Sequence, residues 1–233
     1  MVNVMTGPKP APEPPGRRQR KRQRMASHMA AVAFELFEKS GYEAVTMEQV
    51  AAAADVAKAT LYSYFPVKEA LVAHRFKDEI AEGMAALAGR LAAHRSFVSR
   101  MRFLLRESAA WHTSKRTYLP HYLRYLNSVA AYAASDAHKE TGSRLTWDTM
   151  TAMFHAGQQG GEVATNLPAE KLAWSLQYLL YGAVTHWLVH PEADLAREFL
   201  QSFELLMKGA AADKPAQARK GAAAGKNGKE RTR

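Results

Sequence analysis

Residues 45–71 read VTMEQVAAAADVAKATLYSYFPVKEAL, and this stretch decides the fold. Thr46 followed three residues later by Gln49 forms the pattern of a capping box, which predicts that a helix begins directly after Thr46. Asp55 follows this short helix, and Asp is one of the few residues other than glycine that tolerate a left-handed backbone at a helix end. The local signals therefore predict a short helix and a tight turn.

A second short helix is predicted from Lys58 to about Phe65, because Pro66 disfavours helical geometry in the residue before it. Leu61 and Phe65 are four residues apart and therefore share the inward face. The outward face is small, polar and aromatic. Lysine and hydroxyl groups can bond phosphates or base edges in a DNA groove, and small methyl groups can touch thymine. The alternative is an ordinary amphipathic helix with a solvated face.

The two short helices form the pattern of a helix-turn-helix that places its second helix in the major groove. A preceding helix is predicted from the apolar stripe of Met25, Met29, Val32, Ala33, Leu36 and Phe37, with Gly41 as its C-cap. The residues predicted to contact DNA are Arg24, Thr46, Lys58, Ala59, Thr60, Tyr62, Ser63, Tyr64 and Lys68.

Several short segments in this region carry a family resemblance: MAAVAFELF at residues 29–37, Gly41-Tyr42, TLY at 60–62, YFP at 64–66 and KEAL at 68–71. Together they make the stretch from Arg24 to Leu71 resemble the DNA-binding domain of the TetR family of transcriptional regulators. The resemblance implies a homodimer, a ligand pocket among the middle helices, and an interface built from the last two helices of each subunit.

The chain has 233 residues and a formal net charge of +10, and it contains no cysteine. Disulfides, cysteine-bound zinc and a thiol nucleophile are thereby excluded. The apolar runs are shorter than the ~20 residues of a membrane helix, so the expected location is the cytoplasm, with no membrane contact. The positive charge lies in the tails: residues 1–24 hold seven Lys or Arg against one acidic residue, and residues 209–233 hold seven against two.

Both tails are predicted to be disordered. The cluster Arg17–Arg24 adjoins the first helix, which places it within reach of phosphates or a minor groove. The C-terminal tail, rich in Ala, Gly and Lys, either adds nonspecific DNA affinity or only keeps the protein in solution.

The rest of the chain shows helical periodicity without strand or hairpin signals. The expected helices span residues 68–93, 97–111, 118–132, 147–158, 168–190 and 194–208. The predicted fold is all-α: a disordered basic arm (1–24), a helix-turn-helix DNA-binding domain (25–75), a helical ligand-binding and dimerisation domain (76–208), and a disordered basic tail (209–233).

Aromatic residues are frequent in the larger domain. They predict a pocket for an apolar or aromatic small molecule between helices, and the alternative is a plain core and dimer interface. The predicted ligand-binding residues are Glu107, Trp111, Tyr122, Trp147, His155 and Tyr178.

Apolar stripes over residues 168–190 and 194–208 predict a two-fold symmetric interface between two subunits. His186 and His190 are four residues apart, but no carboxylate of that helix completes a metal site, so no metal is expected. No cofactor is expected either. No catalytic signature is present, which argues against an enzyme. The resulting hypothesis is a ligand-responsive transcriptional repressor that binds a double-stranded operator. The alternatives are a nonspecific DNA-compacting protein and an enzyme with a borrowed bundle.

Overall fold

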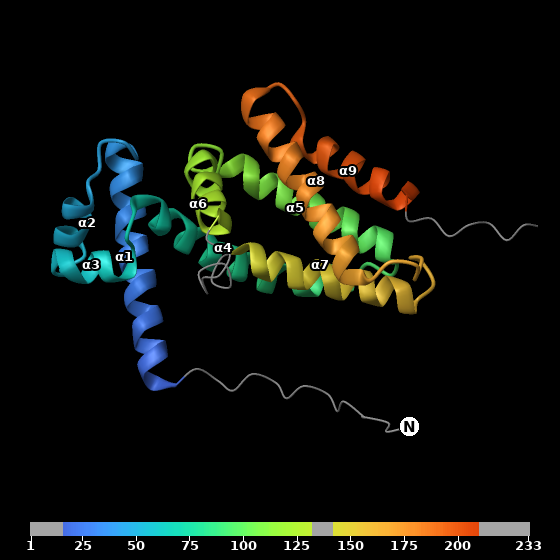
Figure 1. The fold of residues 1–233 in the computed structure, drawn as a ribbon, viewed down its shortest axis with the longest axis horizontal. Coiled ribbons are helices and arrows are strands. Elements are labelled where there is room, and N and C mark those ends of the chain that lie inside the picture. Colours follow the sequence, from blue (N-terminus) through green and yellow to red (C-terminus); the bar gives the residue numbers. More distant parts are fainter. Residues whose placement is uncertain (1–15, 132–141, 210–233) are drawn as a thin grey trace, which may run out of the picture. The chain divides into compact units, whose positions relative to one another are not determined.

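The computed structural model describes residues 16–131 and 142–209, and these ranges contain helices and no strand (Figure 1). The predicted all-α fold is confirmed. The outer portions of the predicted arm and tail, residues 1–15 and 210–233, lie outside the described residues. The helices are α1 (Arg17–Ser40), α2 (Met47–Ala53), α3 (Lys58–Tyr64), α4 (Lys68–Ala92), α5 (Phe97–Ser114), α6 (Leu119–Ala131), α7 (Gly142–Gln159), α8 (Ala169–Val189) and α9 (Leu195–Gly209).

The chain packs as two compact units. Unit 1 comprises Met1–Ala93 with Ala110–Thr149, and unit 2 comprises His94–Ala109 with Met150–Arg233. Helices α5 and α7 contribute residues to both units. This division follows the packing of the backbone, whereas the boundary predicted between residues 75 and 76 separates functions and stays a prediction.

The signals at the ends of the short helices act as predicted. The Thr46 hydroxyl accepts a hydrogen bond from the Gln49 amide, and the Gln49 side chain accepts one from the Thr46 amide, which completes the capping box. Asp55 has a positive φ of 53°, and Gly41 ends α1 with a φ of 84°. The turn between α2 and α3 is therefore set by residues within it.

The first helix begins earlier than predicted. It was expected from Met25, with residues before it disordered, but α1 begins at Arg17. The disorder predicted for residues 17–24 is therefore wrong. Arg, Lys and Gln are good helix formers, and a helix whose later turns are packed can extend one residue at a time without a new nucleus.

Aromatic side chains hold α1 against α4 and against Tyr118, the residue directly before α6. The Phe34 ring lies 6.2 Å from the Phe76 ring of α4 and 4.9 Å from the Tyr118 ring, measured between centroids. Phe76 is fully buried. Burying a large apolar side chain contributes about 1.5–3 kcal/mol, so these rings join α1 and α4 in one core.

Unit 2 is built around Phe97 at the start of α5. Its ring lies 5.2 Å from that of Phe154 on α7 and 5.9 Å from that of Phe203 on α9. The Phe97 amide donates to the Glu162 carboxylate over 2.7 Å. Gly157 faces the same ring so closely that a Cβ there would lie 2.9 Å from it. Glycine is thus required by the close approach of α7 to α5.

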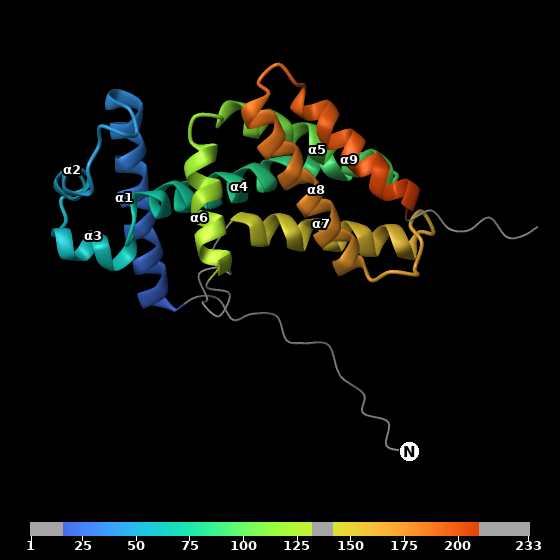
Figure 2. The ribbon, with the colours of Figure 1, turned by 45° about the horizontal axis from the view of Figure 1, so that its top comes forward.

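The last two helices pack against each other within unit 2, and both views show them side by side (Figures 1 and 2). Their buried residues include Leu172, Leu176 and Trp187 on α8 and Phe199 and Phe203 on α9. Other predicted helix ends agree to within a few residues, except that α7 begins at Gly142 where Trp147 was expected.

Candidate nucleic-acid interface

The outward face of α3 is the centre of the predicted DNA-binding site. Leu61 is fully buried and Phe65 is 4% exposed, as the sequence predicted for the inward face. The exposed face carries Lys58, Ala59, Tyr62 and Ser63, with Thr60 half-buried. The predicted phase of this helix is therefore confirmed, and its exposed side is free of bulky aliphatic residues.

An ion pair joins the two short helices at the leading end of α3. The Lys58 ammonium contacts the Glu48 carboxylate of α2. Hydrogen bonding from Lys58 lowers the pKa of Glu48, and the same bond raises the pKa of Lys58. The Lys58 ammonium also lies 5.8 Å from the Tyr62 ring centroid. A phosphate or base edge that binds Lys58 must either share its ammonium group with Glu48 or displace Glu48 from it. The sequence did not indicate this competition.

Two other predicted DNA contacts use their hydroxyls within the protein. Thr46 accepts a hydrogen bond from the Gln49 amide at 3.2 Å, and its side chain also hydrogen-bonds Glu48. Ser63 donates its hydroxyl to the Thr60 carbonyl at 2.7 Å. Both hydroxyl groups are therefore engaged within the protein, and Ser63 offers an oxygen acceptor in this state.

Lys68, which the sequence predicted to contact a phosphate, makes hydrogen bonds within the protein. Its ammonium donates to the carbonyl oxygens of Tyr42, at 2.7 Å, and Val45, at 3.0 Å. It also lies 4.2 Å from the Tyr42 ring centroid. Two of its three protons are thus used to hold the loop between α1 and α2, so the structure assigns Lys68 a structural part. Sequence spacing cannot show such a pairing, because the loop and Lys68 meet only after folding.

Arg22 of α1 contacts Tyr64, the last residue of α3. Its guanidinium carbon lies 4.7 Å from the centroid of the Tyr64 ring. Arg24, the predicted contact next to it, is exposed on the same helical stretch. The contact of Arg22 with Tyr64 joins α1 to the end of α3, and no pattern in the sequence indicates this pairing.

The loop after α1 also contacts α6. The rings of Tyr42 and His121 stack with centroids 3.7 Å apart, and Arg124 forms an ion pair with Glu69 at 3.0 Å. Burial and the nearby Glu69 raise the pKa of the Tyr42 phenol. Burial and the charge of Arg124 lower the pKa of His121. The neutral forms of both rings are therefore favoured where α6 meets the DNA-binding segment.

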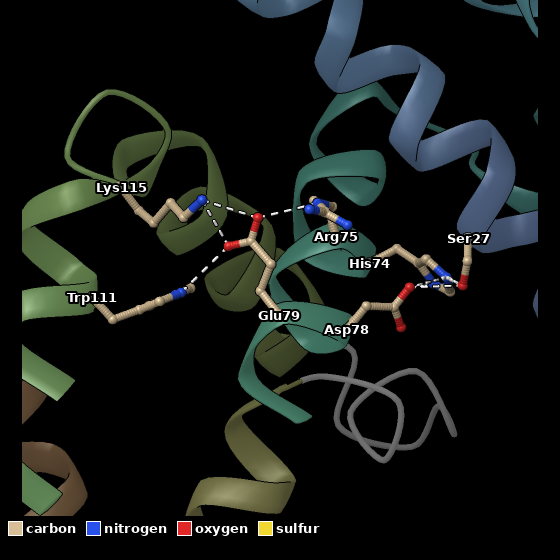
Figure 3. Close-up of polar contacts among 7 residues, drawn as sticks. All are labelled: Ser27, His74, Arg75, Asp78, Glu79, Trp111 and Lys115. Carbon is tan, nitrogen blue, oxygen red and sulfur yellow. Dashed lines mark hydrogen bonds and ion pairs between the residues drawn. The ribbon is translucent and has the colours of Figure 1, made fainter. Parts of the chain in front are cut away.

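A polar cluster connects α1 with α4 farther along (Figure 3). The Ser27 hydroxyl donates to the Asp78 carboxylate at 2.7 Å and lies 3.2 Å from Nε2 of His74. His74 and Asp78 are one turn apart on α4, with 3.6 Å between Nε2 and the carboxylate. If α4 moved relative to α1, the hydrogen bonds of Ser27 with His74 and Asp78 would break, or Ser27 would have to move together with α4.

The next residue of α4, Glu79, turns toward α5 (Figure 3). Its carboxylate lies 2.8 Å from the Lys115 ammonium and 3.1 Å from Nε of Arg75. It also accepts a hydrogen bond from Nε1 of Trp111 at 3.3 Å. Asp78 and Glu79 thus bind α1 and α5 from adjacent positions on one helix.

Three of the predicted ligand residues belong to unit 1. Trp111 and Tyr122 both place their rings edge-on to Phe76, at 4.9 and 5.1 Å. The indole N–H of Trp111 is engaged by Glu79. The indole nitrogen of Trp147 is buried without a hydrogen-bond partner among the described residues, and the Arg144 guanidinium lies 5.0 Å from its ring. Trp147 is the member of this set with an unsatisfied donor.

The other three predicted ligand residues belong to unit 2. Glu107 is half-buried. His155 is exposed and lies 3.2 Å from Glu170, and Tyr178 is 60% exposed beside Trp174. The structure therefore does not place His155 or Tyr178 in an enclosed site. The reason is helix phase: apolar residues surround most of α8, so periodicity alone did not show that Tyr178 faces outward.

Among the described residues, no group of three or more His, Cys, Asp or Glu side chains could hold a metal ion. His186 and His190 lie with ring centroids 4.5 Å apart, and His190 is 3.4 Å from Glu192. None of the helices in the described ranges combines the length and apolar character needed to span a bilayer.

Comparison with known proteins points to one family. Residues 30–74 match the family described as bacterial regulatory proteins, tetR family. The chain is 25% identical over 190 residues to a putative mycofactocin biosynthesis transcriptional regulator, MftR, of Mycobacterium tuberculosis, with 82% of this chain and 93% of that protein covered.

Solved structures share the fold. FadR of Thermus thermophilus, described as a TetR family transcriptional repressor in complex with lauroyl-CoA, is 25% identical with a TM-score of 0.69, covering 84% of this chain and all of that one. The fatty acid degradation regulator FadR of Bacillus halodurans has a TM-score of 0.58 at 17% identity, covering 79% and 95% of the two chains. Residues 30–74 thus form a DNA-binding domain of the tetR type, and over about four fifths of its length the chain is similar to transcriptional regulators of the TetR family.

Proposed function

We propose that this protein is a homodimeric repressor that binds an operator through α3 and is released by a small apolar or aromatic effector. The observation that carries the proposal is the exposed face of α3, where Lys58, Thr60 and Tyr62 stand on a helix fixed by buried Leu61 and Phe65. Such a face can enter a major groove, because it combines donors with small methyl groups. A chromosomal operator would place its action in the cytoplasm.

The DNA-binding proposal is tested by selecting duplexes from a random-sequence library with the full chain. We expect an enriched, two-fold symmetric site bound far more tightly than unrelated DNA. Tyr62→Ala and Lys58→Ala should each weaken specific binding by about 1–3 kcal/mol. A protein that only compacts DNA would enrich no sequence. Unchanged affinity in the double variant would reject this assignment of the reading face.

The effector proposal rests on the helical C-terminal part and on the FadR relative, whose structure holds lauroyl-CoA. An acyl chain or aromatic group would suit a site lined by Trp111, Tyr122 and Trp147, with the unpaired indole N–H of Trp147 as a donor to a polar group. A ligand acts on DNA binding only if it favours one conformation over the other.

We expect lauroyl-CoA, used as the first probe, to raise the melting temperature and to release operator DNA, since ligand binding stabilises the state that it prefers. Coenzyme A without an acyl chain is the matched control and should do neither. A set of aromatic compounds tests the other effector class by the same two readouts. Absence of any melting shift and any DNA release across both classes would argue against ligand control.

The dimer proposal rests on apolar residues that α8 and α9 leave exposed in the single chain. Trp174 is 47% exposed, Val189 is 72% exposed and Leu205 is 63% exposed. Large exposed apolar groups on adjacent packed helices are typical of a subunit interface. Two copies would bring two reading helices to one operator, so that the second half-site binds at a high effective concentration.

A further inference from the structure

The N-terminal turns of α1, residues 17–24, form a basic helical extension ahead of the DNA-binding segment. Six of these eight residues are Arg or Lys, and all eight are exposed. The extension contains no acidic residue, so nothing within it neutralises the charge. At 1.5 Å per residue, it adds about 12 Å to the helix.

The uncharged residues of the extension show how its charges are arranged around the helix. Gln19 and Gln23 continue, at alternating steps of three and four, the buried stripe of Ala26, Ala30 and Ala33. The two glutamines therefore lie in line with the core-facing side, and the arginines and lysine occupy the remaining faces. Because no apolar side chain stands among them, the extension has no face that could insert into a membrane.

The extension is held in place relative to the reading helix. Arg22 lies over the ring of Tyr64, the last residue of α3, at 4.7 Å. Both views of the fold show the beginning of α1 projecting past α3 (Figures 1 and 2). The charged helix and the proposed groove-reading helix therefore keep a defined spacing, because both belong to unit 1 and share a direct contact.

We propose that residues 17–24 bind the phosphate backbone beside the half-site read by α3, as a rigid helix rather than as a flexible arm. This inference rests on the proposed operator binding. A polyanion with evenly spaced charges is the partner that six cations spread over several faces of one helix fit best. The extension would lengthen the contacted DNA beside each half-site, without reading bases.

Two variants of the full chain separate charge from helical form. The first, R17Q/R18Q/R20Q/K21Q, removes four charges and keeps good helix formers, and it leaves Arg22 and Arg24 in place. The second, Gln23→Pro, keeps all six charges and disconnects the extension from the packed part of α1. Proline is tolerated in the first turn of the shortened helix that would remain. The four-charge variant should melt at the wild-type temperature, because its changed side chains are exposed. The proline variant should lose only the exposed helical turns before residue 23, and its melting temperature is measured to check that the packed part of α1 remains folded.

The measurements are the salt dependence of binding and hydroxyl-radical footprints, both on a duplex selected by the wild-type protein. The four-charge variant should reduce the slope of log Kd against log salt by roughly two to four for each bound subunit, at about 0.9 for each phosphate that the variant no longer neutralises. Both variants should lose protection of the flanks beside the half-sites and keep protection of the half-sites.

The possible outcomes are distinct. Wild-type slope and flank protection in the four-charge variant would overturn the proposal that this segment binds DNA. If only the Gln23→Pro variant kept the wild-type salt slope and footprint, residues 17–24 would bind DNA as a flexible arm, and the proposal that they bind as a rigid helix would be wrong. Failure of the wild-type protein to select any duplex sequence would instead count against the proposed operator binding itself.

Discussion

At the scale of single residues, the two lysines predicted to contact DNA, Lys58 and Lys68, both have partners within the protein. Lys58 is paired with Glu48, although both side chains are more than half exposed. Lys68 is occupied by two loop carbonyls. In the proposed DNA complex, Lys58 would therefore meet DNA only by exchanging its partner, whereas Lys68 holds the loop between α1 and α2.

Replacing Glu48 by glutamine should tighten operator binding and steepen its dependence on salt. The substitution removes the anion that competes with phosphate for Lys58, and hydrogen bonding to Lys58 is the main reason that the pKa of Glu48 is lowered. Fluorescence anisotropy at several salt concentrations measures both effects. Glu35→Gln, an equal charge change at an exposed position of α1, is the control. Equal gains from the two variants would point to a general charge effect.

Lys68→Met should destabilise the fold by about 1–3 kcal/mol, because two carbonyl groups lose their charged donor. Urea unfolding measures this loss. Lys77→Met changes a half-buried lysine on the same helix and should cost less. If Lys68→Met left stability unchanged and only weakened DNA binding, the ammonium would be a phosphate ligand after all.

At the scale of elements, α4 connects α1 with the end of α5 in unit 1, beside the direct contact between the loop after α1 and α6. Asp78 holds α1 through Ser27, and Glu79 holds the end of α5 through Lys115 and Trp111. Because the two carboxylates are adjacent in the chain, a displacement of α4 would change its contacts with α1 and with the end of α5 at the same time. An effector that displaced α4 could therefore change the position of α1 and, with it, of α3.

Glu79→Gln should lower the free energy of unfolding by roughly 1–3 kcal/mol, a value reduced from that of a fully buried pair because Lys115 and Arg75 are partly exposed. Their side chains are 26% and 35% exposed. Glu82→Gln, at an exposed position on the same helix, is the matched control and should be nearly neutral. A neutral result for Glu79→Gln would mean that the cluster adds no stability.

The packing of α7 against α5 gives a second test at this scale. Gly157→Ala should destabilise unit 2 by about 1–3 kcal/mol through overpacking, since the new Cβ would lie 2.8 Å from the Val163 side chain and 2.9 Å from Phe97. Gly83→Ala on α4 has open space around it and should stabilise slightly. Thermal unfolding of both variants decides the point, and equal stabilities would disprove the close approach.

At the scale of the whole molecule, the proposed DNA binding and the proposed dimer would be linked, because each chain carries one copy of α3. Tyr178→Glu with Leu205→Glu should shift the protein to monomers in analytical ultracentrifugation and weaken operator binding at least about tenfold. Leu145→Glu, which charges an exposed leucine on α7, is the control and should leave the dimer intact. A dimeric double variant would rule out these faces of α8 and α9 as the interface.

The sequence by itself determined where the short helices begin and end. The Thr46–Gln49 box, Asp55, Gly41 and Pro66 act on residues within a few positions, so their effect does not depend on the rest of the fold. It also determined the phase of α3, because Leu61 within the helix and Phe65 directly after it are both apolar and lie four residues apart. The TetR family could be identified for the same reason, since its motifs lie in this continuous segment.

Only the tertiary structure decided which distant side chains meet. The partners of Lys68 lie 26 and 23 residues away, and those of Glu79 lie 32 and 36 residues away. Such pairs depend on how helices cross, which periodicity does not specify. The outward position of Tyr178 was hidden for a related reason: a helix that is apolar on most sides gives no unique inward face. The helical form of residues 17–24 came from extension of a packed helix, because their own charges carry no start signal.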